Sequence, residues 1–250
     1  MEGKIITVWS SRGNVGTSTV AIGLAKELSD INNKTILVDL NLLQPRISYL
    51  LGLEIDNHSI DVLYPYSMSK ENLTEEIIKA NCDVLNDNLL VLKGTNNPSN
   101  LYGQKYINIE ILNSILNILK NNFDYIVLDV HHTITNVGTY IALNRADIIY
   151  TILDKKALTI MSFRDVKEWL FNNFDRDKFK IVINQNEKKS VLSISDIENY
   201  INMPVNYFLP NVKGFDEAIN STKFKDSCKN RVFKNYYKEL RNIAKTIKEV

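Results

Sequence analysis

The sequence predicts an α/β fold, a doubly wound and mostly parallel sheet with helices on both faces. Short apolar stretches rich in β-branched residues alternate with longer stretches in which apolar residues recur at helical spacing. The strand candidates carry almost no charge, which is typical of strands covered on both faces. With 250 residues and 44% hydrophobic residues, the chain can bury a sizeable core. We expect one domain over residues 1–250.

The expected strands are Ile5–Trp9, Thr35–Val38, Leu89–Leu92, Tyr125–Val130, Ile148–Leu153, Phe179–Ile183 and Val205–Phe208. Helical periodicity covers 17–30, 107–121, 137–144, 157–172, 194–201 and 214–221. Residues 54–88 are less regular, with a short helical pattern near 73–78, and we interpret them as an excursion within the domain. Residues 229–250 predict a C-terminal helix.

Residues 8–19, between the first strand and the first helix, form the most informative segment. They read Val-Trp-Ser-Ser-Arg-Gly-Asn-Val-Gly-Thr-Ser-Thr. Phosphate-binding loops of the pattern G-x-x-x-x-G-K-[ST] occupy this position, since their glycines let backbone N–H groups close on phosphates and their hydroxyl holds Mg²⁺. Gly16 and Ser18 fit that pattern, whereas Ser11 and Thr17 replace the first glycine and the lysine. Taken alone, the segment is also compatible with an ordinary strand-to-helix turn.

Two acidic residues end apolar strands and support the phosphate-binding interpretation. Asp129 follows Tyr-Ile-Val-Leu, the place where P-loop enzymes keep the carboxylate that binds Mg²⁺. Asp39 ends the second expected strand in the same manner. Carboxyl ends of parallel strands face the ligand side of open α/β sheets. Asn41 lies two residues beyond Asp39, and its neutral amide cannot act as a general base.

These motifs resemble the MinD/ParA group of deviant-Walker ATPases. The resemblance rests on the loop, on Leu-Val-Asp-Leu-Asn-Leu-Leu-Gln-Pro at 37–45 and on Phe-Asp-Tyr-Ile-Val-Leu-Asp at 123–129, and it extends over about residues 4–222. The segments 88–98, 181–184 and 209–211 look like the CpaE/TadZ branch, which is associated with pilus assembly. The resemblance implies a P-loop NTPase-like, Rossmann-like fold, with ATP and Mg²⁺ as cofactors.

The resemblance also implies roles for individual residues. Its phosphate-contacting loop falls on Gly13, Asn14, Val15, Gly16, Thr17 and Thr19. Arg12 takes the place of the signature lysine, which in this family reaches the phosphates of the partner subunit in a nucleotide-sandwich dimer. Ser18 is the implied Mg²⁺ ligand, with Asp39 and Asp129 as its acidic partners. Asn184 matches the residue that contacts adenine, and Pro210 lies in a second base-facing segment.

The departures from the family pattern concern residues that would carry the chemistry. Asn41 replaces the water-positioning Asp, so no catalytic residue is assigned. His131 and His132 replace a Pro-Pro pair, and Thr133 replaces a glycine. Loss of the lysine contact at Thr17 is worth about 1.5–3 kcal/mol, or roughly 10- to 100-fold in affinity. We therefore expect nucleotide binding to survive and hydrolysis to be weak or absent.

Other features narrow the function classes. A formal charge of +1 predicts no strong nucleic-acid binding. Cys82 and Cys228 have no metal-ligand spacing, which disfavours an iron–sulfur protein, and adjacent His131 and His132 would face opposite sides of a strand. The chain begins without an apolar leader and has no membrane-spanning stretch, so we expect a cytoplasmic protein.

The C-terminal stretch 229–250 has two interpretations. Phe233, Tyr237, Leu240, Ala244 and Ile247 share one helical face, while lysines and arginine occupy the others. A closing helix packed on the sheet is the interpretation we favour. The alternative is a peripheral membrane-surface helix.

The sequence as a whole favours a degenerate MinD/ParA-like ATP-binding protein. We expect it to act as a nucleotide-dependent homodimer in localisation or assembly, with a Tad or type IV pilus or a secretion machine at the membrane or cell pole as its partner. One alternative is an active ATPase that cycles on a membrane or nucleoid. Another is a scaffold that binds no nucleotide.

Overall fold

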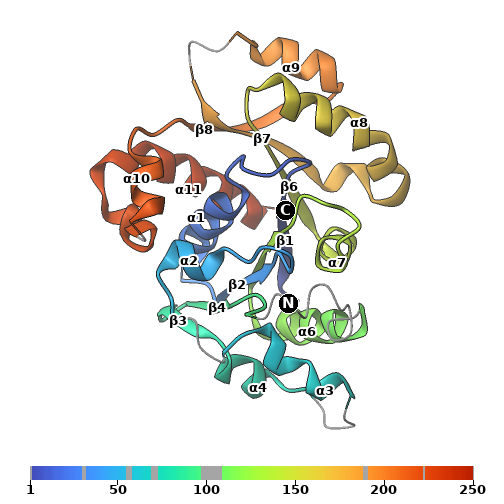
Figure 1. The fold of residues 1–250 in the computed structure, drawn as a ribbon, viewed down its shortest axis with the longest axis vertical. Coiled ribbons are helices and arrows are strands. Elements are labelled where there is room, and N and C mark those ends of the chain that lie inside the picture. Colours follow the sequence, from blue (N-terminus) through green and yellow to red (C-terminus); the bar gives the residue numbers. More distant parts are fainter. Residues whose placement is uncertain are drawn as a thin grey trace.

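The computed structural model describes residues 2–29, 32–54, 58–68, 73–96, 109–187, 191–221 and 223–249. At its centre lies a sheet with the strand order β3-β4-β2-β5-β1-β6-β7-β8. β3 pairs antiparallel with β4, and all other neighbouring strands pair in parallel. The predicted α/β fold with a mostly parallel sheet is confirmed, and helices cover both faces of the sheet (Figure 1).

The strands are β1 (Lys4–Trp9), β2 (Thr35–Leu40), β3 (Asp83–Asn86), β4 (Leu89–Leu92), β5 (Tyr125–Val130), β6 (Ile148–Leu153), β7 (Phe179–Asn186) and β8 (Val205–Pro210). All the expected strands are present, several of them longer by one to three residues. β3 was not expected, because its four residues alternate between half-buried and exposed and include two polar side chains. Part of the predicted excursion therefore joins the sheet.

The helices are α1 (Thr17–Ser29), α2 (Ile47–Leu51), α3 (Pro65–Met68), α4 (Glu75–Ala80), α6 (Ile109–Asn122), α7 (Val137–Arg145), α8 (Ala157–Asn173), α9 (Ile194–Ile201), α10 (Phe215–Asn220) and α11 (Lys234–Glu249). Short 3-10 helices are η1 (Ile60–Leu63), η2 (Arg176–Lys178), η3 (Lys223–Lys229) and η4 (Arg231–Phe233). The predicted start of α6 at residue 107 lies outside the described residues.

The C-terminal helix begins at Lys234 rather than at residue 229, which corrects the predicted boundary. The preceding residues form η3 and η4, and the side chain of Asn230 accepts a hydrogen bond from the Val232 N–H. Such side-chain bonds to nearby backbone offer the chain an alternative to the α-helix. The apolar face of α11 packs against α1 and β8, as the closing-helix interpretation predicts.

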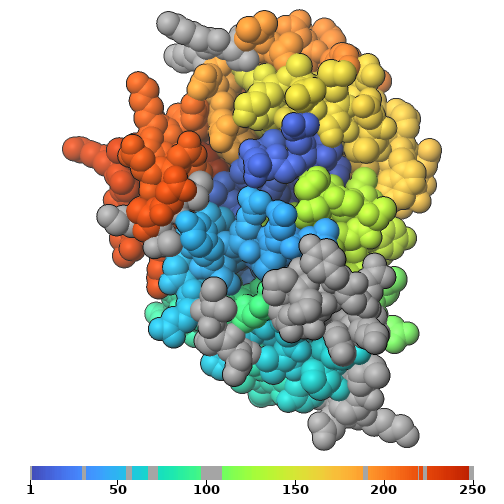
Figure 2. Space-filling model, viewed as in Figure 1, coloured from blue at the N-terminus to red at the C-terminus, as the bar shows by residue number. Residues whose placement is uncertain are grey.

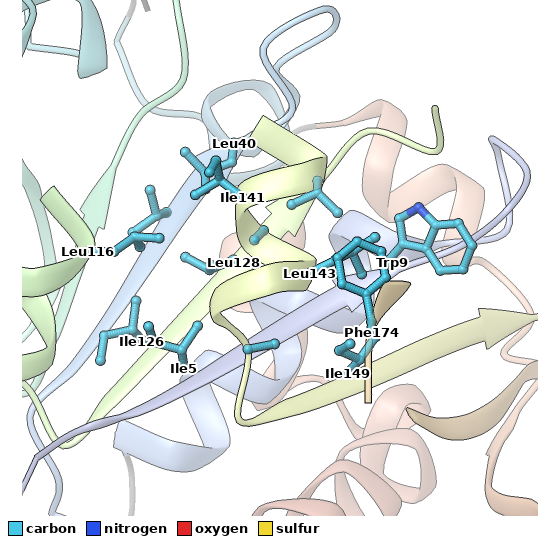
Figure 3. Packing of buried hydrophobic residues seen from close by; sticks show 14 of the residues in the cluster. Ile5, Trp9, Leu40, Leu116, Ile126, Leu128, Ile141, Leu143, Ile149 and Phe174 are labelled. Carbon is cyan, nitrogen blue, oxygen red and sulfur yellow. The ribbon is translucent and has the colours of Figure 1, made fainter. Parts of the chain in front are cut away.

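Alternate residues of each central strand face opposite layers of helices. Ile126 and Leu128 of β5 point to the core under α6, α7 and α8, whereas Val127 points to the core under α1 and α11. This follows from the period of two in a strand. Figure 3 shows the first core, with Ile5, Leu128, Ile141 and Phe174 among its side chains. Together the two cores fix the sheet between the helix layers.

Candidate functional site

A cleft of about 340 Å³ opens at the carboxyl ends of the central strands. Its walls come from the loop between β1 and α1, from the segment after β2, from the segment after β5 and from α10. In Figure 2 the loop is exposed in dark blue near the centre of the face, beside the lighter-blue segment after β2. The lining residues are Arg12, Gly13, Asn14, Gly16, Thr17, Ser18, Thr19, Asn41, Gln44, Arg46, Leu50, Val130, His131, His132, Gln185, Phe215 and Asp216. The structure thus brings the predicted loop to a cleft.

The loop contains two residues with positive φ angles. Asn14 and Gly16 both have positive φ angles, of 63° and 89°. Asparagine tolerates this region better than most residues, so the replacement of a glycine at position 14 is accommodated. The carbonyl of Gly16 accepts hydrogen bonds from the Thr19 hydroxyl, at 2.7 Å, and from the Val20 N–H, at 3.0 Å. These bonds join the loop to the first turn of α1.

Asn184 lies behind the loop rather than on the wall of the cleft. Its amide nitrogen donates to the carbonyl of Val15 at 2.8 Å, and its side chain is buried. A Cβ on Gly16 would collide with that amide, which explains the need for glycine there. The next residue, Gln185, lines the cleft, while Pro210 lines a separate hollow of about 580 Å³ beside α11. The two residues assigned to the base are therefore not in the cleft.

Asp39 and Asp129 are direct neighbours in the parallel pairing of β2 and β5, and both are fully buried. Asp39 accepts hydrogen bonds from the backbone N–H groups of Asn41, Arg46 and Ile47, at 2.9–3.0 Å. Burial raises the pKa of Asp39 to about 6, although these hydrogen bonds partly offset the rise. The carboxylate therefore shapes the segment that follows β2.

The carboxylate of Asp129 has no hydrogen-bond partner on either oxygen. Burial and then the negative charge of Asp39 raise the pKa of Asp129 well above its ordinary value. The Ser18 hydroxyl is close enough to lower that pKa in part, without reaching hydrogen-bond geometry with either oxygen. A buried carboxylate with unfilled acceptors beside a second carboxylate and a hydroxyl suits a hard cation such as Mg²⁺. These residues fit the implied metal.

Asn41 lies on the wall of the cleft and is nearly buried. Its side-chain oxygen accepts a hydrogen bond from the Gln44 N–H at 3.1 Å. The amide therefore occupies the position from which a carboxylate would face the cleft, but it cannot take a proton from water.

His131 and His132 lie side by side on the wall of the cleft, with ring centroids 4.0 Å apart. Nδ1 of His131 accepts a hydrogen bond from the Thr133 N–H at 3.1 Å. Burial, followed by the charges of His132 and Arg46, lowers the pKa of His131 to about 4. Burial and the charges of Arg46 and Arg12 also lower the pKa of His132. Both shifts favour the neutral imidazole, so neither ring is a substitute for the charge of the missing lysine.

Sequence reasoning missed Arg46, which lies over the loop. Its Nη1 donates to the side-chain oxygen of Asn14 at 3.2 Å, and its Nη2 donates to that of Gln44 at 3.0 Å. The sequence signal that could have identified Arg46 is a basic residue at the end of the segment after β2. Phe215 and Asp216 of α10 were also missed. They lie far from the loop in the sequence, so no local pattern indicates that they line the cleft.

A phosphate-type loop on a mostly parallel sheet, with an acidic pair at the neighbouring strand ends, defines the P-loop NTPase α/β fold. The family model described as an AAA domain matches residues 3–170. The chain therefore belongs to that family. The proteins that it is similar to include MinD proteins in sequence and MinD and ParA proteins in fold.

Individual relatives agree with this assignment. The septum site-determining protein MinD of Synechocystis sp. is 28% identical over 217 residues, which cover 83% of this chain and 76% of that protein. The ParA family ATPase of Chlorobium tepidum TLS shares the fold with a TM-score of 0.84 at 17% identity, covering 96% and 98% of the two chains. MinD of Pyrococcus horikoshii OT3, solved with Mg-ADP, gives a TM-score of 0.74 at 15% identity, covering 98% and 96%.

Proposed function

We propose that this chain binds ATP with Mg²⁺ in the cleft beside the loop. The observation that carries the proposal is the buried Asp129 carboxylate, whose oxygens lack partners next to Asp39 and Ser18. A cation there would neutralise the acidic pair, and the loop N–H groups of residues 13–19 would hold the phosphates. A relative with the same fold was solved with Mg-ADP, which supports the choice of ligand.

In this proposal the chain hydrolyses ATP slowly or not at all. Thr17 leaves the loop without its lysine, and Asn41 supplies no general base. Charge stabilisation of the transition state and orientation of the attacking water are the two main parts of phosphoryl-transfer catalysis. Since both are weakened, occupancy of the site rather than turnover is the proposed signal.

We further propose that nucleotide occupancy controls a homodimer that acts in localisation or assembly. Arg12 is exposed at the mouth of the cleft, where it could reach phosphates held by a second copy. The proposed partner is a Tad or type IV pilus or a secretion machine, and it rests only on the resemblance of residues 88–98, 181–184 and 209–211 to the CpaE/TadZ branch. Every helix within the described residues is too short or too polar to cross a bilayer.

Two other functions are alternatives to this one. A relative named for septum-site determination and another named as a ParA family ATPase favour a positioning ATPase that turns over ATP on a membrane or nucleoid. The missing lysine favours a scaffold that binds no nucleotide. In that case the loop would be a structural turn only.

The deciding experiment is calorimetric titration of ATP and Mg²⁺ into the full chain, with phosphate release measured on the same sample. Gly16→Asp is the control, because a side chain there collides with Asn184, and circular dichroism checks its fold. Binding without release supports the proposal. Rapid phosphate release that vesicles or DNA stimulate supports the positioning ATPase. Absence of binding at millimolar ATP supports the scaffold that binds no nucleotide.

A further inference from the structure

The loop lacks the lysine that would face its own phosphates, because Thr17 occupies that position. Arg46 lies directly across the loop and lines the same cleft. Its guanidinium is held by hydrogen bonds to the side-chain oxygens of Asn14 and Gln44, at 3.2 and 3.0 Å. Both acceptors are neutral amides, so these contacts orient the guanidinium without neutralising its charge.

The fold fixes the position from which this side chain extends. The Arg46 N–H donates to Asp39 at 2.9 Å, and the adjoining Ile47 N–H donates to the same oxygen at 3.0 Å. Ile47 is fully buried and begins α2. The backbone of Arg46 is therefore tied to the acidic pair, while its side chain crosses to the loop. One arginine thus joins the carboxylate side of the cleft to the phosphate-loop side.

Arg46 and Arg12 both line the cleft. Only Arg46 is tied to both of its sides, because its backbone N–H donates to Asp39 and its guanidinium donates to Asn14 of the loop. Arg46 therefore lies between the acidic pair and the phosphate loop.

We infer that Arg46 supplies, from the same chain, the phosphate-binding cation that Thr17 cannot provide, and that it contacts the terminal phosphates of a bound nucleoside triphosphate. The inference rests on the proposed function. A guanidinium suits this task, because its planar donors can bind phosphate oxygens in pairs. Asn14 and Gln44 keep it beside the loop until phosphate oxygens take over as acceptors. Arg12 is then left to a role outside the chain's own site.

The test is a double-mutant cycle on the full chain, with fluorescent ATP and Mg²⁺ as the probe. Arg46→Ala should weaken binding by about 10- to 100-fold, the range expected for a lost charge-assisted contact. Adding Thr17→Lys to that variant should restore affinity to within about threefold of the unmodified chain. Thr17→Lys alone should gain much less, since the position of the cation is already filled. Arg176→Ala, in η2 at the amino end of β7 and outside the cleft lining, is the matched control.

The outcomes separate this inference from the proposed function. If the unmodified chain binds ATP and Arg46→Ala binds equally well, the inference is wrong and the proposed function stands. Thr17→Lys could instead raise affinity by the same factor with and without Arg46. The two residues would then act independently, and the inference that Arg46 takes the place of the lysine would be wrong. If the unmodified chain binds no nucleotide, both proposals fall. Thermal melting without ligand shows whether Arg46→Ala merely unfolds the loop.

Discussion

Asp129 stands out at the residue scale because the fold gives its carboxylate no partner. Charged groups are seldom buried without compensation, since desolvation costs several kcal/mol. Here a second buried carboxylate, Asp39, lies beside it in the neighbouring strand. The apo protein therefore carries an electrostatic cost at the place where the proposed cation would bind. Such costs are typical of functional sites.

Asp129→Asn should stabilise the apo protein against urea by about 2 kcal/mol at pH 7.5. Buried Asp39 and Asp129 have raised folded-state pKa values, so the folded state holds protons that the unfolded state releases. Stability from this pair is therefore present near pH 4 and is lost as the pH rises through about 6. The gain on substitution should be small at pH 4.5 and large at pH 7.5.

His131 acts in the opposite direction, because its lowered pKa makes the folded state gain stability as the pH rises from about 4. Its contribution is the same in both proteins and cancels in the difference between the variant and the parent. A difference that is constant with pH would contradict the assigned cause.

Asn41→Asp should raise the rate of ATP hydrolysis above that of the parent. The side-chain oxygen of Asn41 already accepts the Gln44 N–H, and a carboxylate would keep that contact while adding a base at the cleft. General-base catalysis contributes about 10²- to 10⁴-fold, so phosphate release should rise by roughly tenfold or more, and further when combined with Thr17→Lys. Asn186→Asp, outside the cleft, is the control. Unchanged release in the combined variant would show that Asn41 is not the limiting position.

At the scale of elements, α1 and α11 pack directly against each other. Gly23 of α1 faces Leu240 of α11 so closely that a Cβ would meet its side chain. Leu240 is fully buried, together with Tyr237 and Ile247. Since α1 begins at the phosphate loop, this packing supports the site from behind.

Leu240→Ala should cost about 2–5 kcal/mol of unfolding free energy, because it removes a buried side chain and leaves a cavity between α1 and α11. Lys238→Ala, on the exposed side of the same helix, should change stability by less than about 0.5 kcal/mol. Chemical denaturation of both variants measures the two values. Equal effects would mean that α11 is not packed as described.

The sequence predicted the elements whose signal is local. Apolar runs such as Tyr125–Val130 mark buried strands, and all the expected strands are present. β3 and α2 were not predicted, since four and five residues are too short to show a period. The loop and the acidic pair were found through motif position, whereas the place of Asn184 behind the loop depends on packing between β7 and Val15.

For the whole molecule, the proposed dimer gives a prediction that is independent of binding within one chain. Arg12→Ala should leave affinity for ATP and Mg²⁺ within about threefold of the parent, because Arg46 acts in the chain's own site. The ATP-dependent dimer should disappear in sedimentation velocity runs, since Arg12 would contact the phosphates held by the partner. Arg176→Ala should dimerise normally. A dimer that persists without Arg12 would place the interface elsewhere.

Trp9 has a consequence for optical experiments. It is fully buried where β1 meets the loop, and its indole N–H donates to the carbonyl of His132 at 3.3 Å. The other tryptophan of the chain, Trp169, is 45% exposed on α8. The two indoles should therefore emit at separate wavelengths, and acrylamide should quench only Trp169. In a Trp169→Phe protein, the remaining fluorescence would report a ligand's arrival without any attached dye.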